Sequence, residues 1–220
     1  MDKVEIEKKA IEYLNSNKKI FFERYTQNIK QSNNKLAIFT AGMSGVGKTE
    51  FAIYLKEHSN ELLHIDTDEI RKFFQPVGYN GQNADIFQKP SSRGFSELFN
   101  YALKNNYSLI LDSNLSSINQ ATQNIERLLK RDYSVVINYF YNSPKKCFEY
   151  AIRREVVTHR KVPKEIFIQS NINSFRTVIE LKSIFKEDIV LNFFDKRYDK
   201  FYRDIDSDFL QKEIGNEFDF

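Results

Sequence analysis

Gly42-Met43-Ser44-Gly45-Val46-Gly47-Lys48-Thr49 is the stretch of this chain that decides its fold. Its spacing matches the phosphate-binding pattern G-x-x-x-x-G-K-[ST] at every fixed position. In such a loop, glycines let successive backbone N–H groups turn toward a phosphate, and the following helix presents its partly positive N-terminus. Lys48 adds a positive charge for the outer phosphates, and Thr49 offers its hydroxyl to Mg²⁺. The stretch therefore predicts a nucleotide phosphate and a magnesium ion as ligands.

The segments on both sides of this loop fit that interpretation. Residues 36–40 form an apolar run that is typical of a buried strand, and residues 49–58 predict a helix with Phe51, Ala52 and Leu55 toward the sheet. A glycine turn without a ligand is the alternative interpretation.

Length and composition favour one domain with a sizeable core. The chain has 220 residues and no Pro/Gly/Ser-rich linker. We expect N-terminal helices over residues 1–33, a core over residues 34–195 and a C-terminal extension over residues 196–220. Its 33 Lys and Arg residues nearly balance its 30 Asp and Glu residues, which does not indicate nucleic-acid binding. The charged N-terminus, the lack of a long apolar run and a single cysteine, Cys147, predict a cytoplasmic protein without a membrane partner.

Strand and helix patterns alternate after the phosphate loop, as a parallel sheet requires. Apolar runs predict further strands at residues 62–65, 108–111, 133–141 and 189–194, whereas residues 75–92 contain two prolines and two glycines and predict a long loop. We expect helices at residues 95–105, 117–130, 144–159 and 207–214, and one that begins at Pro163. The chain is thus expected to be α/β, a three-layer sandwich of the P-loop NTPase type with a mostly parallel central sheet.

The element Asp66-Thr67-Asp68-Glu69-Ile70-Arg71 places two carboxylates at the end of the second expected strand. Ligands of open α/β sheets bind at the carboxyl ends of the strands. A carboxylate there can accept a proton from a substrate hydroxyl or hold the magnesium shell. We assign the general base to Asp68 and a structural role to Asp66; the alternative is that both cap the following helix.

Asp112 follows the third expected strand of the chain and is a candidate for holding magnesium through water, although it could instead be a turn residue. His58 and His64 lack the spacing of metal ligands. Arg153, Arg154 and Arg160 flank the junction of two expected helices, where arginines can close over a transferring phosphate. Because adjacent helical residues point about 100° apart, at most one of Arg153 and Arg154 is expected to face the site.

These motifs together resemble the zeta-toxin kinases. The resemblance rests on the phosphate loop, the D-x-D-x-x-R element, the strand end at residues 109–113, and Arg154 with residues 159–163. It implies a phosphate-loop kinase that uses ATP and Mg²⁺ to phosphorylate a hydroxyl of UDP-N-acetylglucosamine, and a cognate antitoxin protein as partner. In that interpretation Lys48 and Thr49 hold ATP and magnesium, Asp68 is the base, and Arg154 and Arg160 bind phosphates.

The acceptor side departs from the family pattern. Ser113-Asn114-Leu115-Ser116 stands where the family has a glycine-rich stretch with an arginine. Asp68, Arg71, Glu97 and Asn114 are the substrate-binding candidates, and Glu97 could equally be an exposed helix residue. Two alternatives stay open: a kinase for another small acceptor, such as a nucleoside or an antibiotic, and a nucleotide-dependent switch without transfer.

Overall fold

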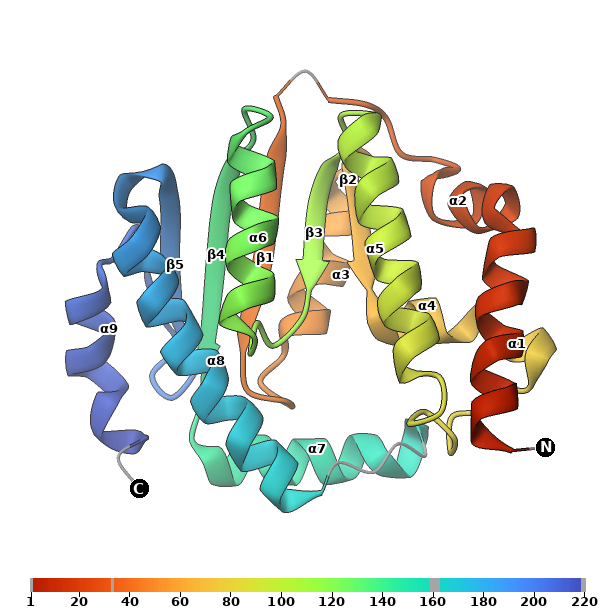
Figure 1. The fold of residues 1–220 in the computed structure, drawn as a ribbon. Helices are drawn as coiled ribbons and strands as arrows, with labels where there is room; N and C mark the ends of the chain where they lie inside the picture. Colours follow the sequence, from red (N-terminus) through yellow and green to blue (C-terminus); the bar gives the residue numbers. More distant parts are fainter. Residues whose placement is uncertain (1, 33, 159–162, 219–220) are drawn as a thin grey trace.

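One six-stranded sheet forms the centre of the molecule (Figure 1). The computed structural model describes residues 2–32, 34–158 and 163–218. Within them the strand order is β2-β3-β1-β4-β5-β6, and every pairing is parallel except that of β6 with β5. The predicted α/β fold with a mostly parallel sheet is therefore confirmed. The strands are β1 (Leu36–Gly42), β2 (Leu62–Asp66), β3 (Ser108–Asp112), β4 (Ser134–Tyr141), β5 (Ile189–Asp195) and β6 (Lys200–Tyr202).

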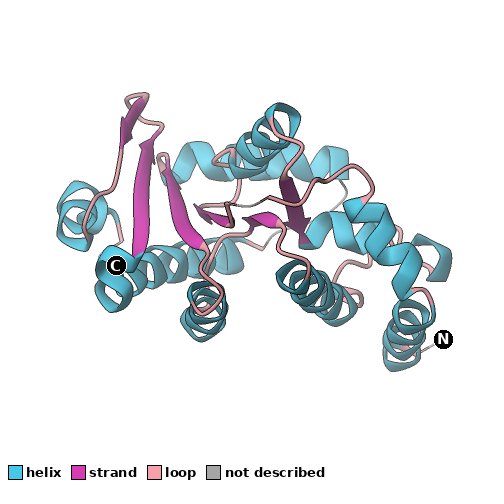
Figure 2. Cartoon of the chain, turned by 90° about the horizontal axis from the view of Figure 1, so that it is seen from above, coloured by secondary structure: helices cyan, strands magenta, loops and turns pink. Residues whose placement is uncertain are grey.

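Helices cover both faces of the sheet, so that the molecule has three layers (Figure 2). In Figure 1, α5, α6 and α8 lie in front of the sheet, α3 lies behind it, and α7 crosses below the strands. The helices are α1 (Lys3–Ser16), α2 (Lys18–Thr26), α3 (Lys48–His58), α4 (Thr67–Lys72), α5 (Gln88–Lys104), α6 (Ile118–Leu129), α7 (Pro144–Thr158), α8 (Lys164–Phe185) and α9 (Ser207–Ile214). No helix in the described ranges combines the length and the apolar character that a membrane span needs.

The central strands are apolar because both of their faces are covered. All five residues of β3 are buried, and so are the last six of β1. Strands buried on both faces read as continuous apolar runs rather than alternating ones. This is the pattern from which the strands were predicted.

The two N-terminal helices extend the hydrophobic core beside β2. Leu14 of α1 and Phe21 of α2 are fully buried, and the Phe21 ring lies 5.0 Å from that of Phe73, which follows α4. Gly94 of α5 sits at the same junction, where an added Cβ would lie 2.8 Å from Ile70 Cγ2. These close contacts make the N-terminal helices part of the packed structure.

The structure corrects two sequence predictions. Helix α5 begins at Gln88, inside the segment predicted as a loop, and Pro90 stands in its first turn, where a missing N–H costs no helical hydrogen bond. Strand β6 was not predicted, because three residues between turns carry too short a pattern.

Parallel pairing brings the functional segments to one edge of the sheet. Gly42, at the end of β1, pairs with Phe140 of β4, and Asp66, at the end of β2, pairs with Asp112 of β3. The carboxyl ends of these strands therefore lie together, facing α7 at the bottom of Figure 1.

Candidate active site

The phosphate loop leaves β1 through a backbone that only glycine adopts without strain. Gly42 and Gly47 have φ values of +120° and +93°. A side chain at Gly42 would collide with the Phe140 carbonyl of β4, and one at Gly47 would meet the Lys196 ammonium group. Gly47 is also the N-cap residue of α3, so the loop delivers the chain directly into the helix.

Lys48 is half-buried at the start of α3, with its ammonium group turned back onto the loop. Its Nζ donates hydrogen bonds to the carbonyl oxygens of Gly42 (2.9 Å) and Met43 (2.7 Å). Burial lowers the pKa of Lys48 to about 8, although the nearby Asp112 carboxylate opposes that change. An ammonium group held by two carbonyl dipoles at the wall of a cavity is suited to receive an anionic ligand.

Asp112 lies at the floor of the site with one carboxylate oxygen already oriented. The hydroxyl of Thr40 donates a 2.8 Å hydrogen bond to Asp112 Oδ1. Burial favours the neutral acid, but interactions with His64, Thr40 and Lys48 outweigh it and lower the pKa of Asp112. The group is thus a carboxylate at neutral pH, as a magnesium-binding role requires.

The two carboxylates of the D-x-D-x-x-R element do different things. Asp66 is the N-cap of α4, and its Oδ1 accepts a 2.8 Å hydrogen bond from the Asp68 N–H group. Burial, followed by the charges of Asp68 and Asp112, raises the pKa of Asp66 to about 6. The Asp68 side chain instead pairs with two arginines: its Oδ1 with Arg71, and its Oδ2 with Arg154 at 3.0 Å.

These groups line one cavity of about 1000 Å³. Arg154 reaches it from α7, across the mouth, and it is half-exposed, whereas Arg71 is buried and also bonds the Gln88 side chain. Eleven of the predicted site residues line the cavity: Ser44, Gly45, Val46, Gly47, Lys48, Thr49, Asp68, Arg71, Asp112, Asn114 and Arg154.

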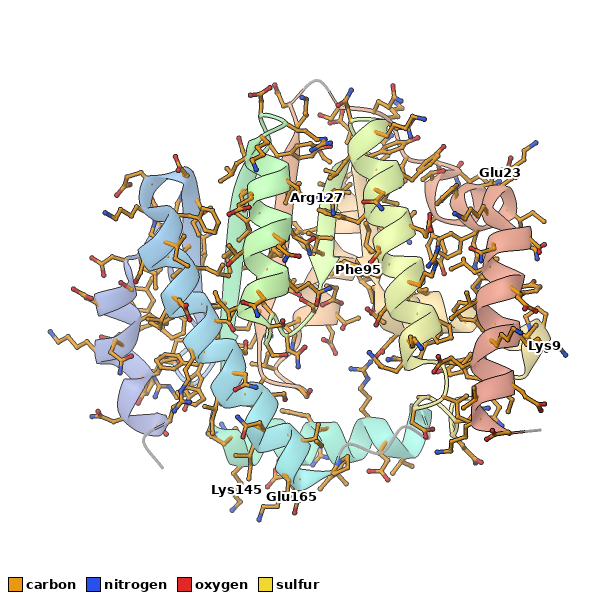
Figure 3. The ribbon with its side chains drawn as sticks, in the orientation of Figure 1. Lys9, Glu23, Phe95, Arg127, Lys145 and Glu165 are labelled. Carbon is orange, nitrogen blue, oxygen red and sulfur yellow. The ribbon has the colours of Figure 1, made fainter. Side chains whose placement is uncertain are left out.

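A second cavity, of about 250 Å³, adjoins the first. It lies between the N-terminal halves of α5 and α6, and Phe95 of α5, labelled in Figure 3, lines it. Four residues line both spaces: Thr67, Gln88, Ser113 and Asn114. The predicted nucleotide side and the predicted acceptor side are therefore contiguous.

The remaining predicted residues lie elsewhere. Gly42 and Met43 stand behind the cavity, where their carbonyls accept from Lys48. Glu97, predicted as a substrate ligand, lines neither cavity, and its carboxylate pairs with Lys18 of α2 at 3.0 Å and with Arg93. Arg160 lies outside the described residues.

Several lining residues were missed by the sequence analysis. Asn142 and Lys196 directly follow β4 and β5, so their position after a strand was a usable signal. Tyr150 and Asp199 carried no such signal. His64, set aside for lack of metal-ligand spacing, has its Nε2 only 3.6 Å from Asp112 Oδ2, because β2 and β3 are parallel neighbours.

Comparison with known families accounts for this arrangement. The family model described as Zeta toxin matches residues 22–205. The chain belongs to the zeta toxin family. This confirms the resemblance that the motifs indicated, and the match includes the phosphate loop, the D-x-D-x-x-R element and α7. No curated protein sequence matches the chain.

Solved structures support the fold of this zeta toxin family member. It is similar to a structure from the PezAT chromosomal toxin–antitoxin system of Streptococcus pneumoniae (TM-score 0.70, 18% identity, covering 94% of this chain and 92% of that one). It also resembles AvrRxo1-ORF1:-ORF2 with ATP (TM-score 0.64, 10% identity, covering 90% of this chain and 65% of that one). A third match is the Pnkp1/Rnl/Hen1 RNA repair complex (TM-score 0.55, 14% identity, covering 69% and 47%).

The depressed pKa of Lys48 predicts a specific pH dependence of stability. Because the folded-state pKa of about 8 lies below the ordinary value of 10.5, the unfolded chain binds more protons between these values, and stability rises with pH. Relative to Lys48→Met, the free energy of unfolding of the wild type should rise by about 2 to 3 kcal/mol between pH 7 and 10. Urea unfolding of both proteins measures this. Parallel pH profiles would show that Lys48 titrates normally.

Proposed function

We propose that this protein is an ATP-dependent phosphotransferase that phosphorylates a hydroxyl group of a small molecule. The observation that carries the proposal is that the Asp68 carboxylate and the phosphate loop line the same cavity, with Arg154 above them. Phosphoryl transfer requires this combination: a bound phosphate donor, a group that accepts the hydroxyl proton, and positive charge over the transferring phosphoryl group.

The donor side follows from the loop and α3. Backbone N–H groups of residues 44–49 and the N-terminus of α3 bind the phosphates of ATP, and the Lys48 ammonium exchanges its carbonyl contacts for the outer phosphates. Thr49 and Asp112 line this end of the cavity and are the residues that would hold Mg²⁺ there, Thr49 by its hydroxyl and Asp112 by its carboxylate. When bound, Mg²⁺ neutralises charge on the phosphate oxygens.

On the acceptor side, Asp68 takes the proton of the attacking substrate hydroxyl. The hydroxyl oxygen bonds to the γ-phosphorus of ATP, and the bond from that phosphorus to the departing ADP oxygen breaks. The pair between Asp68 and Arg154 must open for this to happen. A bound triphosphate gives Arg154 an alternative anionic partner, so nucleotide binding releases the Asp68 Oδ2 atom for the substrate. Arg160 is proposed to join Arg154 on the phosphates.

We further propose UDP-N-acetylglucosamine as the acceptor. Family membership supports this choice, and the smaller cavity beside Asn114 supplies room next to Asp68. Arg71, buried and held by Asp68 and Gln88, lines the larger cavity and would border the substrate there, next to Gln88, which lines both cavities. The same space favours transfer to an acceptor over a switch that only hydrolyses nucleotide, and a nucleoside or an antibiotic is the alternative acceptor.

A toxin role with a protein antitoxin completes the proposal. It is supported by the family and by the similarity to a structure from the PezAT toxin–antitoxin system. We propose that the antitoxin acts by covering the cavity that holds the phosphate loop, which would prevent ATP from binding.

The acceptor is tested by incubating the protein with labelled ATP and a panel of sugar nucleotides, nucleosides and antibiotics. Mass spectrometry should detect phosphorylated UDP-N-acetylglucosamine. Asp68→Asn should lower kcat by about 10² to 10⁴, because the base is lost, and ATP should still bind, because the phosphate loop is unchanged. Asp208→Asn, an exposed carboxylate on α9, is the matched control and should leave kcat unchanged. Turnover of Asp68→Asn within a few fold of wild type would assign the base elsewhere.

Arg154 and Arg153 form a natural matched pair. Arg154 contacts Asp68 at the cavity, whereas Arg153 stacks over the Tyr150 ring at 5.7 Å and does not line the cavity. Arg154→Ala should lower kcat by about 10² to 10³, the cost of removing one transition-state donor, and Arg153→Ala should change it less than about threefold. An equal decrease in kcat in both variants would contradict a specific role of Arg154 in phosphoryl transfer.

The toxin role predicts growth arrest when the wild-type protein is expressed from an inducible promoter. Asp68→Asn should relieve the arrest and Asp208→Asn should not, at protein levels matched by immunoblot. Normal growth of cells expressing an active wild-type kinase would contradict the toxin role while leaving the phosphotransferase proposal intact.

A further inference from the structure

Three side chains converge below the phosphate loop, on the neighbouring strands β2 and β3. His64, Asp66 and Asp112 each offer one ligand atom, and these atoms all lie within 4.8 Å of one another. Around a first-row metal ion, ligand atoms at about 2.1 Å from the metal lie roughly 3 to 4 Å apart. Small rotations of these side chains would therefore bring them to a common centre.

Two atoms of this cluster face each other away from solvent. The side chains of His64 and Asp112 are 9% and 4% exposed. His64 Nε2 and Asp112 Oδ2 lie 3.6 Å apart, within the distance of an ion pair but beyond hydrogen-bond length, and within the described ranges neither atom has a hydrogen-bond partner. Buried polar atoms are nearly always hydrogen-bonded, so a cation between these two atoms would supply contacts that they do not give each other.

The carboxylates are already held as metal ligands usually are. The Thr40 hydroxyl bonds Asp112 Oδ1, and the Asp68 N–H group bonds Asp66 Oδ1, each at 2.8 Å. Such outer contacts orient ligating carboxylates and are typical of metal sites. Asp66 and Asp112 also line the large cavity, from which water can supply further ligands.

We propose that His64, Asp66 and Asp112 form a binding site for a divalent transition metal ion such as Mn²⁺, Co²⁺ or Zn²⁺. One imidazole nitrogen with two carboxylates suits these ions, whereas Mg²⁺ prefers oxygen ligands alone. The site shares Asp112 with the magnesium site proposed for ATP, but it uses His64 and Asp66 and needs neither Thr49 nor a nucleotide. It therefore stands independently of the proposed phosphotransferase activity.

The test is a titration of metal-free, nucleotide-free protein with Co²⁺, followed by its visible absorption and by calorimetry. We expect one Co²⁺ per chain. His64→Gln should weaken binding at least about tenfold, because it removes the nitrogen ligand. His58→Gln, which changes an exposed histidine on α3, should bind Co²⁺ as the wild type does. Equal affinity of His64→Gln and wild type would overturn the proposal.

A second measurement does not depend on the folding of the His64 variant. The chain has three histidines, so the double variant His58→Gln/His159→Gln retains only His64. Pulsed electron paramagnetic resonance of Mn²⁺ bound to this protein should show coupling to one histidine nitrogen, and ¹⁵N-histidine labelling should change that coupling. Bound Mn²⁺ without nitrogen coupling, or no bound Mn²⁺, would overturn the proposal.

Discussion

The parallel pairing of β1 with β3 and β4 is the constraint on which the rest of the structure depends. It aligns Phe39 with Leu111 and Gly42 with Phe140, so that the phosphate loop leaves the sheet where the neighbouring strands also end. A shift of one residue would turn every side chain of β1 to the opposite face and bring a side chain against the Phe140 carbonyl, where only glycine fits. Hydrophobic burial of the central strands thus sets the position of a polar site.

That position brings together charges that are costly to bury alone. The charged groups at the cavity are Lys48, Asp66, Asp112 and Arg71. The pKa of Lys48 is lowered and that of Asp66 is raised, and both changes favour the neutral form of the group. Each charge is partly compensated by a carbonyl, a hydroxyl, a backbone N–H group or an opposite charge nearby. Oriented polar groups in such a site stabilise developing charge without reorganising, which suits phosphoryl transfer.

Much of the fold and the phosphate side of the site could be predicted because their signals are local. The loop pattern, the apolar strand runs and the carboxylates at strand ends each occupy a few consecutive residues. Lys48, Thr49, Asp68 and Asp112 accordingly line the cavity where their motifs placed them. The start of α5 is not evident from the sequence because Pro90 is typical of a loop, although a first helical turn also accepts it.

The sequence by itself determined the phosphate loop, the alternation of strands and helices, and the residue types available for chemistry. Tertiary structure alone decided which of them meet. Arg154 bonds Asp68, which lies 86 positions away in the chain, and Lys18 bonds Glu97, which lies 79 positions away. His64 faces Asp112 from the neighbouring strand. These contacts follow from strand order and helix packing, which depend on burial summed over the whole chain and leave no pattern in any short segment of it.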